Sequence, residues 1–541
     1  MPEQIPWLTV LTFSPLIGIL VLLFLPKANS RSLRTAALVT TLVPLALSLW
    51  LFAQYDPSAE PSGVYVEQAA WIQAALNSEA LNGVTSYVYE FQYRLAADGL
   101  SLPLAVLAAL VTTMAALASV HIKKRWKAFY IWFLLLETGM LGVFLARDLI
   151  LFFLFFELTL ISLFFLIAIW GFFNREKAAN TFLIYNGIGS AIMLIAFVLL
   201  IVNAGFQSVQ DGETLRLVYS GNYETILANL ADPSAYVNLP DEQMNGDNPF
   251  FMSEGMRWTV FILIFAAFAI KLPVLPFHTW MLRVHAEAPP SVVMIHSGVL
   301  LKMGAYGLLR FGVFLFPQQA DDAVFVIALL GAANILYGAI VAFVQNEFKL
   351  VLAYSSISHM GIVLLGIASL NEIGLQGAVF QLVSHGLISA LLFLIVGSLH
   401  ERTGTTELQE LGGLARSLPF MSGVLLTAGM ASLGLPGLSG FVGEFLSFLG
   451  LFDSMKWLTA IAAIGVILTA VYILRSVLKI TFGPLPDRYA ALKDARLIEA
   501  VPMIALLAFI LLLGVYPSIL TDSLQYGFDR LFEQLNSRVG G

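Results

Sequence analysis

The chain has no cysteine among its 541 residues. This absence excludes disulfides, thiolate metal sites and cysteine-ligated iron–sulfur clusters on the chain itself. Charged residues are also scarce at 12%, whereas hydrophobic residues make up 59% and the mean hydropathy is +0.84. A soluble globule does not have this composition, so the sequence predicts a polytopic protein embedded in a lipid bilayer. The modest net charge of −7 gives no indication of nucleic-acid binding.

Fourteen apolar stretches are close to the roughly 20 residues that a helix needs to cross the hydrocarbon. They lie at residues 7–26, 33–53, 100–120, 127–146, 149–171, 178–204, 258–280, 291–315, 323–345, 350–370, 374–399, 420–449, 456–480 and 500–520. Alternate connections carry basic residues, such as Lys123, Lys124 and Arg125. Because basic loops stay in the cytoplasm, we expect both termini on the outer side of a bacterial plasma membrane.

Helix breakers interrupt the seventh and twelfth stretches. Pro273 and Pro276 follow Lys271 in the seventh, and the segment Gly434–Gly440 combines glycines with Pro436 in the twelfth. Irregular backbone at membrane depth is tolerated only where protein or a wet cavity satisfies it, and paired broken helices are typical of transporters built from inverted repeats. Two proline kinks of structural value only are the alternative.

These features together predict an all-α polytopic fold of about fourteen transmembrane helices, with helices 7 and 12 broken. We expect a single integral-membrane domain over residues 1–541 that contains two inverted five-helix repeats. Repeat one would cover about 127–315 and repeat two about 323–480, with flanking helices in 7–120 and 500–520.

Ionisable side chains lie far from the ends of several apolar stretches. Six of them stand out: Glu157, Lys271, Lys302, His359, His385 and Glu444. Because a charge at the bilayer centre costs roughly 2.5 to 3.5 kcal/mol even on the gentlest scale, such residues are most simply read as a path for ions or protons. Structural ion pairs and hydrogen-bonded core histidines are the alternatives.

Physical chemistry suggests a role for each group. Burial in a dry bundle disfavours the charged forms of Glu157 and Lys271, and an opposite charge within reach restores them, so a pair that forms and separates could bind and release a proton. Lys302, His359 and His385 would relay the proton along the midplane. Two further sites are the exit carboxylate Glu444 and, with less support, His278 after the first break. Gln381, His385 and Ser389 share one helix face and could hold ordered water.

Several motifs resemble one known family. They are Leu-Ala-Ala-Asp-Gly-Leu-Ser at 95–101, Phe-Phe-Glu at 155–157, Lys-Leu-Pro at 271–273, Leu-Lys-Met-Gly-Ala-Tyr-Gly at 301–307, Ser-His-Met-Gly at 358–361 and Gly-Phe-Val-Gly-Glu-Phe at 440–445. From about 95 to 450 the chain resembles the antiporter-like, proton-pumping subunits of respiratory complex I, which are related to Mrp antiporters. Glu444 stands where the other branches have lysine, and this is typical of the M (chain 4) branch.

The resemblance implies a proton-translocating membrane subunit of an NADH- or other donor-quinone oxidoreductase. It also implies no cofactor on this chain, since NADH, FMN, iron–sulfur clusters and quinone would bind to partner subunits. An Mrp-type cation/proton antiporter, a membrane subunit of a proton-pumping hydrogenase and a scaffold whose polar residues only fix helix packing are the alternatives. The chain departs from the family pattern at Met281–Arg283, where Leu-Pro-Asp is expected, and at Glu137, an added carboxylate.

Overall fold

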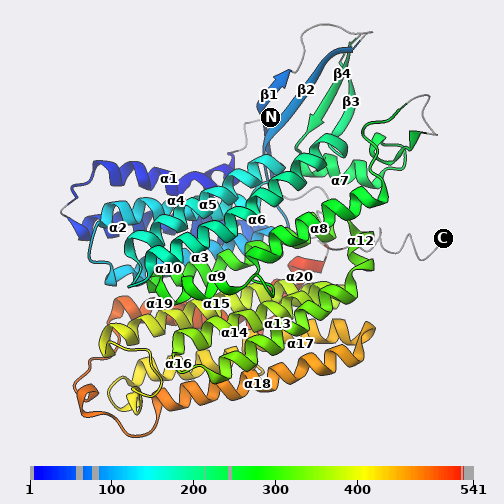
Figure 1. The fold of residues 1–541 in the computed structure, drawn as a ribbon. Coiled ribbons are helices and arrows are strands. Elements are labelled where there is room, and N and C mark those ends of the chain that lie inside the picture. The colour runs from blue at the N-terminus through cyan, green and yellow to red at the C-terminus, as the bar shows by residue number, and fades with distance from the viewer. Residues whose placement is uncertain are drawn as a thin grey trace.

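A computed structural model describes residues 5–27, 29–56, 65–75, 84–211, 214–241, 247–525 and 528 of the chain. Long helices run side by side through the molecule, as Figure 1 shows. The first half contributes α1 (Trp7–Phe24), α2 (Ser30–Gln54), α3 (Ser101–Ala118), α4 (Trp126–Leu145), α5 (Leu149–Trp170) and α6 (Arg175–Asn203). The second half contributes α13 (Val324–Val344), α14 (Phe348–Ala368), α15 (Glu372–Thr403), α18 (Lys456–Thr481) and α19 (Leu497–Val515).

The eighth predicted span is one irregular helix. It joins α10 (Pro290–Ile295) and α11 (Leu301–Gly307) through a π-helical stretch at His296–Leu300, and a second π-helical stretch follows at Leu308–Val313. We refer to Pro290–Val313 as helix 8. A π-helical stretch widens the helix locally and is frequent at functional sites.

Both predicted helix breaks are confirmed. The seventh span consists of α8 (Glu254–Lys271) and α9 (Thr279–Glu287), and the twelfth consists of α16 (Pro419–Ser432) and α17 (Ser439–Ser454). In the described part of the chain, twelve continuous helices are long and apolar enough to cross a membrane, and helix 8 is one of them. The integral-membrane fold is therefore as expected. The two broken pairs would have to supply the remaining crossings, so the count of fourteen stays a prediction.

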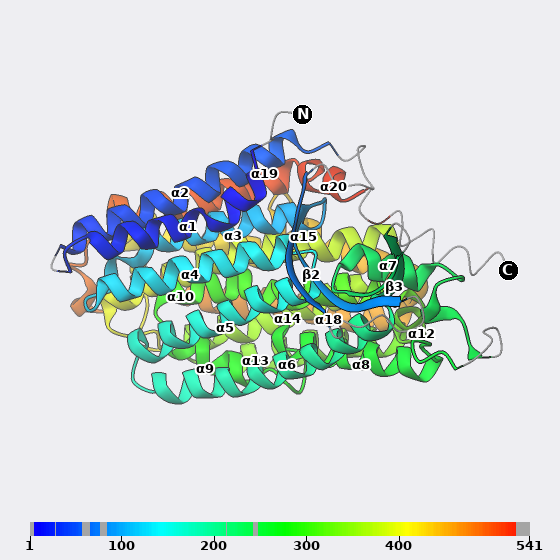
Figure 2. The ribbon, with the colours of Figure 1, turned by 90° about the horizontal axis from the view of Figure 1, so that it is seen from above.

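A four-stranded sheet, which was not expected from the sequence, accompanies the predominantly helical fold. Its strands are β1 (Tyr65–Ala75), β2 (Val84–Ala97), β3 (Phe206–Asp211) and β4 (Thr214–Ser220), in the order β1-β2-β4-β3. The two long loops meet where β2 pairs in parallel with β4. Figures 1 and 2 both place the strands and the short helix α7 (Tyr223–Ala231) at one end of the bundle.

The start of α1 and the short helix α20 (Ser518–Gln525) both lie at the sheet end of the bundle. The backbone N–H groups of Leu8 and Thr9 donate to the carboxylate of Glu67 in β1. The carbonyl of Ser523 in α20 lies against Gly99, just after β2. The start of α1 and α20 therefore lie at the same end of the bundle.

Helix 8 and α15 form the centre of the bundle, since both are buried along their whole apolar length. By contrast, α18 and α19 are mostly uncovered by the rest of the chain. Polar side chains on the two central helices are therefore shielded from lipid on every side, and their polar atoms must be satisfied within the protein or by water.

Candidate functional site

Lys302 and His385, two members of the predicted relay, are in direct contact at the centre of the bundle. The Lys302 side chain lies between the two π-helical stretches of helix 8 and is completely buried. Its Nζ donates to the carbonyl of Ser297 and to Nδ1 of His385 on α15, the latter at 2.7 Å. Because a charged lysine has only donors, this contact leaves Nδ1 of His385 as the acceptor. One proton can therefore pass directly between the two side chains.

His359 and Glu444 form the second contact of the site. His359 on α14 places Nδ1 3.3 Å from Oε1 of Glu444 on α17, and the same nitrogen lies 3.2 Å from Nε2 of Gln381 on α15. An unprotonated Nδ1 can accept from the Gln381 amide, whereas a protonated Nδ1 can donate to Glu444. Both side chains are buried, with His359 4% and Glu444 6% exposed. The protonation state of one nitrogen thus selects its partner.

The two contacts are neighbours. The rings of His359 and His385 lie 5.1 Å apart between centroids. Beside His385 is a small cavity of ≈ 10 Å³, lined among others by Ser355, Ser356 and Ser389. This is about the space that one water molecule needs, and the serines and His385 supply hydrogen-bonding groups among apolar neighbours. Four of the six predicted residues therefore form a continuous line from helix 8 through α15 and α14 to α17.

The break between α16 and α17 lets Glu444 approach the backbone closely. Gly434 has φ +79°, a conformation that favours glycine, and a Cβ at this position would lie 2.6 Å from Oε2 of Glu444. Ser439 at the start of α17 accepts a hydrogen bond of 2.8 Å from Ser384 on α15. The broken helix is thus attached to the central helix beside the carboxylate.

Glu157 and Lys271, which the sequence suggested as a pair, do not make a hydrogen bond with each other. Nζ of Lys271 lies over the rings of Phe156 and Phe182, with 4.9 and 5.5 Å to the centroids. Within the described residues, Nζ of Lys271 and Oε1 of Glu157 are buried without a hydrogen-bond partner. The carboxylate still attracts the ammonium electrostatically. The structure therefore shows the two groups separated, with an aromatic ring against the lysine.

The first break satisfies its own backbone through α13. Asn334 on α13 accepts from the N–H of Leu275 at 2.9 Å and donates to the carbonyl of Pro273 at 3.4 Å. His278, at the end of the break, has Nε2 3.1 Å from the hydroxyl of Tyr337 on the same helix. An amide side chain can satisfy both a freed donor and a freed acceptor, which is why Asn334 suits this place.

A histidine pair was missed from the sequence. Nε2 of His285 on α9 lies 2.9 Å from Nδ1 of His296 on helix 8, and both side chains are completely buried. Their other ring nitrogens have no partner within the described residues. His296 lies in an apolar run of the sequence, and the break before α9 brings His285 to it. The sequence did contain one signal for this pair, a histidine shortly before Pro289 and Pro290 and another shortly after them.

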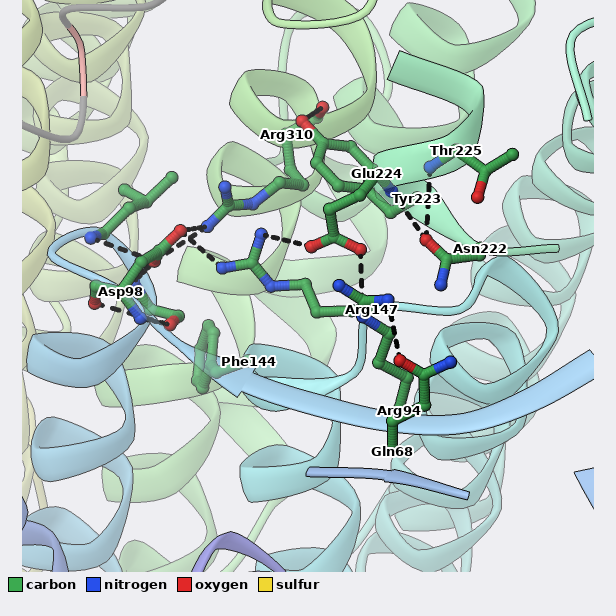
Figure 3. Close-up of polar contacts among 12 residues, drawn as sticks. Gln68, Arg94, Asp98, Phe144, Arg147, Asn222, Tyr223, Glu224, Thr225 and Arg310 are labelled. Carbon is green, nitrogen blue, oxygen red and sulfur yellow. Dashed lines mark hydrogen bonds and ion pairs between the residues drawn. The ribbon is translucent and has the colours of Figure 1, made fainter. Parts of the chain in front are cut away.

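A network of charges at the sheet end was also missed (Figure 3). The carboxylate of Asp98, before α3, forms ion pairs with Arg147 and, at 2.7 Å, with Arg310 of helix 8. Arg147 reaches on to Glu224 at 3.7 Å, and Arg94 contacts the same glutamate at 3.2 Å. Burial disfavours the charged carboxylate, but the two guanidiniums outweigh it and hold the pKa of Asp98 well below its usual range. The network anchors the sheet end of helix 8.

Glu137 on α4 is completely buried, and neither carboxylate oxygen has a hydrogen-bond partner within the described residues. It thus differs from the relay residues, which contact one another. Nowhere in the described ranges do three or more His, Asp or Glu side chains gather in a way that could hold a metal ion.

Comparison with known proteins adds the following findings. Residues 146–470 match the family described as NADH:quinone oxidoreductase/Mrp antiporter, transmembrane. The chain is 36% identical to NADH-quinone oxidoreductase subunit M of Rhodobacter capsulatus, with 98% of each chain covered. It is 37% identical to a chain 4 of NAD(P)H-quinone oxidoreductase from Thermosynechococcus vestitus, covering 97% of this chain and 91% of that protein. A chain in respiratory complex I from Thermus thermophilus superposes with a TM-score of 0.78 at 30% identity, covering 97% of this chain and 99% of that one.

Proposed function

This chain belongs to the NADH:quinone oxidoreductase/Mrp antiporter membrane family, within its subunit M (chain 4) branch, and from that premise we propose that it translocates protons in a complex I-type assembly. The observation that carries the proposal is the unbroken line of titratable groups Lys302, His385, His359 and Glu444. Quinone reduction by NADH or another donor would take place on partner subunits, which would also hold FMN and the iron–sulfur clusters.

In this proposal a proton moves along the line in two direct transfers and one transfer through water. Lys302 passes its proton to Nδ1 of His385 across 2.7 Å. A bridging water would carry it from His385 to His359, whose ring centroids lie 5.1 Å apart. A proton that reaches Nδ1 of His359 exchanges the contact with Gln381 for one with Glu444, the exit carboxylate. Each step needs only a small movement of side chains that are already in place.

Glu157 and Lys271 would act as the switch of the first half. With the two groups separated, the ammonium lies against Phe156 in an apolar pocket and is poised to lose its proton. If Lys271 and Glu157 came together, the charged form of Lys271 would be favoured again. Moving a charge against about 150 mV costs about 3.5 kcal/mol at roughly 2.3 kcal/mol per 100 mV, and forming or breaking an ion pair in a low dielectric can supply that energy. His278 would extend this site toward α13 through Tyr337.

We place the two inverted five-helix repeats at 127–315 and 323–480, because each contains one broken helix with a buried charge beside the break. The sheet end would face the outside of a bacterial plasma membrane, since Lys123, Lys124 and Arg125 lie at the other end. Thiol labelling of intact cells tests this orientation. With an impermeant reagent, Ser234→Cys in the sheet-end loop should react, and Ala491→Cys at the opposite end should not.

The experiment that tests the function compares Lys302→Met with Lys456→Met, a lysine at the exposed start of α18. Sealed vesicles that contain the assembled complex are given the electron donor, and quinone reduction and acidification of the lumen are measured. We expect Lys302→Met to abolish most of both activities and Lys456→Met to leave them intact. Normal acidification by an assembled Lys302→Met complex would refute the relay.

The family description also names Mrp antiporters, which makes cation/proton exchange the second candidate. An exchanger works without electron transfer. Vesicles without donor, given an outward sodium gradient, should show no sodium-driven acidification if the chain acts only in a redox-driven complex. Acidification under these conditions would favour the exchanger.

A further inference from the structure

A pocket at the end of the bundle opposite the sheet is not used by the relay described above. It has a volume of ≈ 330 Å³ and lies between the ends of α3, α5 and α15 and the start of helix 8. Lys123, Lys124 and Glu401 line it together with His121 and His400. The pocket therefore lies between the two halves of the protein, on the side where the basic connections gather.

Two histidines bring titratable nitrogens to this pocket. Nε2 of His121 lies 3.5 Å from the hydroxyl of Ser291, which is completely buried at the start of helix 8. Nδ1 of His400 is buried and has no hydrogen-bond partner within the described residues. A buried nitrogen beside a pocket that is large enough for many water molecules is most simply satisfied by water. The pocket thus combines space for water with groups that exchange protons.

One face of α15 leads from this pocket to the relay. His385, Ser389 and Phe393 line the small cavity of the relay, and Gly397 and His400 line the large pocket. Residues 385, 389, 393 and 397 follow one another at intervals of four, so they share one face of the helix. At 1.5 Å per residue, His385 and His400 are about 22 Å apart along the axis. The large pocket and the relay cavity are therefore neighbours along a single helix face.

Phe393 is the last residue of α15 that lines the relay cavity, before Gly397 and His400 of the large pocket. Its side chain is 3% exposed, and its ring packs edge-on against His285 at 4.9 Å between centroids. Only one helical turn divides Phe393 from Gly397, so the barrier is about 6 Å thick. His285 is the partner of His296 on helix 8, and each has a second ring nitrogen without a partner among the residues that the structure describes. An apolar ring at this position would keep water in the two cavities from joining until the ring moves.

We propose that this pocket is the inlet through which protons from the inner aqueous side reach Lys302 and His385, with His121 and His400 as the collecting groups and Phe393 as the barrier. The inference rests on the proposed function, because it supplies the relay with its source. The route passes from the pocket past Phe393, with the His285–His296 pair beside it, to the Lys302–His385 contact.

The absence of native cysteine makes a blocking experiment possible. Glu401→Cys introduces a thiol at the lining of the pocket, and Glu410→Cys is its matched control outside the lining. Both glutamates form exposed pairs with arginine, Glu401 with Arg496 at 3.4 Å and Glu410 with Arg488 at 3.6 Å, and such pairs contribute little to stability. The assembled complexes are treated with a bulky thiosulfonate or with methyl methanethiosulfonate, beside the parent complex, and labelling is measured by mass spectrometry.

We expect the bulky label on Glu401→Cys to lower donor-driven acidification and quinone reduction at least fivefold, and a reducing agent to restore them. The small label on Glu401→Cys, either label on Glu410→Cys and treatment of the parent should change the rates less than twofold. Normal turnover after complete bulky labelling of Glu401→Cys, or failure of that thiol to react, would overturn the inlet. If Lys302→Met still abolishes pumping in that case, the relay stands and only the inlet is wrong.

The barrier has its own test. In vesicles without donor, an assembled Phe393→Ala complex should dissipate an imposed proton gradient several times faster than the parent, because the two cavities would join. The bulky label on Glu401→Cys in the same chain should suppress this leak. A leak equal to that of the parent would overturn the assignment of Phe393.

Discussion

Removing the titratable proton of Glu444 while keeping its shape is the sharpest perturbation of the proposed relay. With Glu444→Gln, the amide still fills the space beside Gly434 but no longer carries a negative charge. His359 Nδ1 lies 3.3 Å from the carboxylate, and at an effective dielectric constant of about 20 the attraction of an imidazolium to it is about 5 kcal/mol. The substitution therefore removes the main stabilisation of the state in which His359 holds the transferred proton.

The expected loss of rate follows from that energy. If only a third of it, about 1.7 kcal/mol, is felt in the slowest transfer, pumping falls more than tenfold, since about 1.4 kcal/mol corresponds to a factor of ten. Glu444→Asp keeps the charge and should retain much of the activity. Because His359 and Glu444 act as a unit, adding His359→Gln to Glu444→Gln should cost little more.

The assay is donor-driven quinone reduction and acidification in sealed vesicles, with assembly checked on a native gel. Quinone reduction should fall together with pumping if the two are tightly coupled. An assembled Glu444→Gln complex that pumps normally would refute the reasoning and leave the glutamate as a structural partner of His359. Fully additive losses in the double variant would show that the two residues do not share one step.

Three further outcomes are expected. Glu157→Gln and Lys271→Met should each depress pumping, and the double variant should lose less than the sum in free energy; strict additivity in the vesicle assay would contradict a switch pair. Asp98→Asn leaves Arg310 buried without its counter-charge at a cost of about 3 to 5 kcal/mol. The folded-state pKa of Asp98 is lowered, so the stability that its charge gives to the protein is complete above the unfolded pKa of about 3.9 and fades only below it. The variant should therefore unfold at a lower temperature than the parent throughout pH 5 to 8. A lower unfolding temperature at only one end of that range would argue against the ion pairs. Glu137→Met should pump normally and unfold at a higher temperature, because an unpartnered buried carboxylate is removed; lost pumping would place Glu137 on the path.

The helix breaks and the midplane residues were predictable because each has a strong local signal. A proline or a run of glycines cannot continue a helix, and a charge within an apolar stretch is costly, so both are visible in the sequence. The contact between Lys302 and His385 joins residues 83 positions apart. The sequence predicted that these residues cooperate, but it could not supply the distance, which depends on how helix 8 packs against α15.

Features that arise from pairing between distant segments were missed. The sheet depends on β2 and β4, which belong to two different loops, although the alternating aromatic residues Tyr87, Tyr89, Phe91 and Tyr93 in β2 were a period-two signal. Arg147 and Arg310 lie near helix ends, and no motif in the sequence connects them. Only the fold brings both to Asp98, where they are buried.

Irregular backbone and buried charge coincide at three places in this protein, and the reason is physical. Lys271 is the last residue of α8 before its break, Glu444 fits beside Gly434 in the second break, and Lys302 lies between two π-helical stretches. A regular helix uses its carbonyl groups for its own hydrogen bonds, whereas a distorted one has carbonyls that can also solvate a charge. The bond from Lys302 to the carbonyl of Ser297, inside the first π-helical stretch, shows this directly. The π-helical stretch His296–Leu300 contains no proline, so the sequence signal beside it is the charged residue Lys302. Lys302 thus marks distorted backbone within an apparently unbroken apolar segment, whereas Glu137 is buried in the regular helix α4.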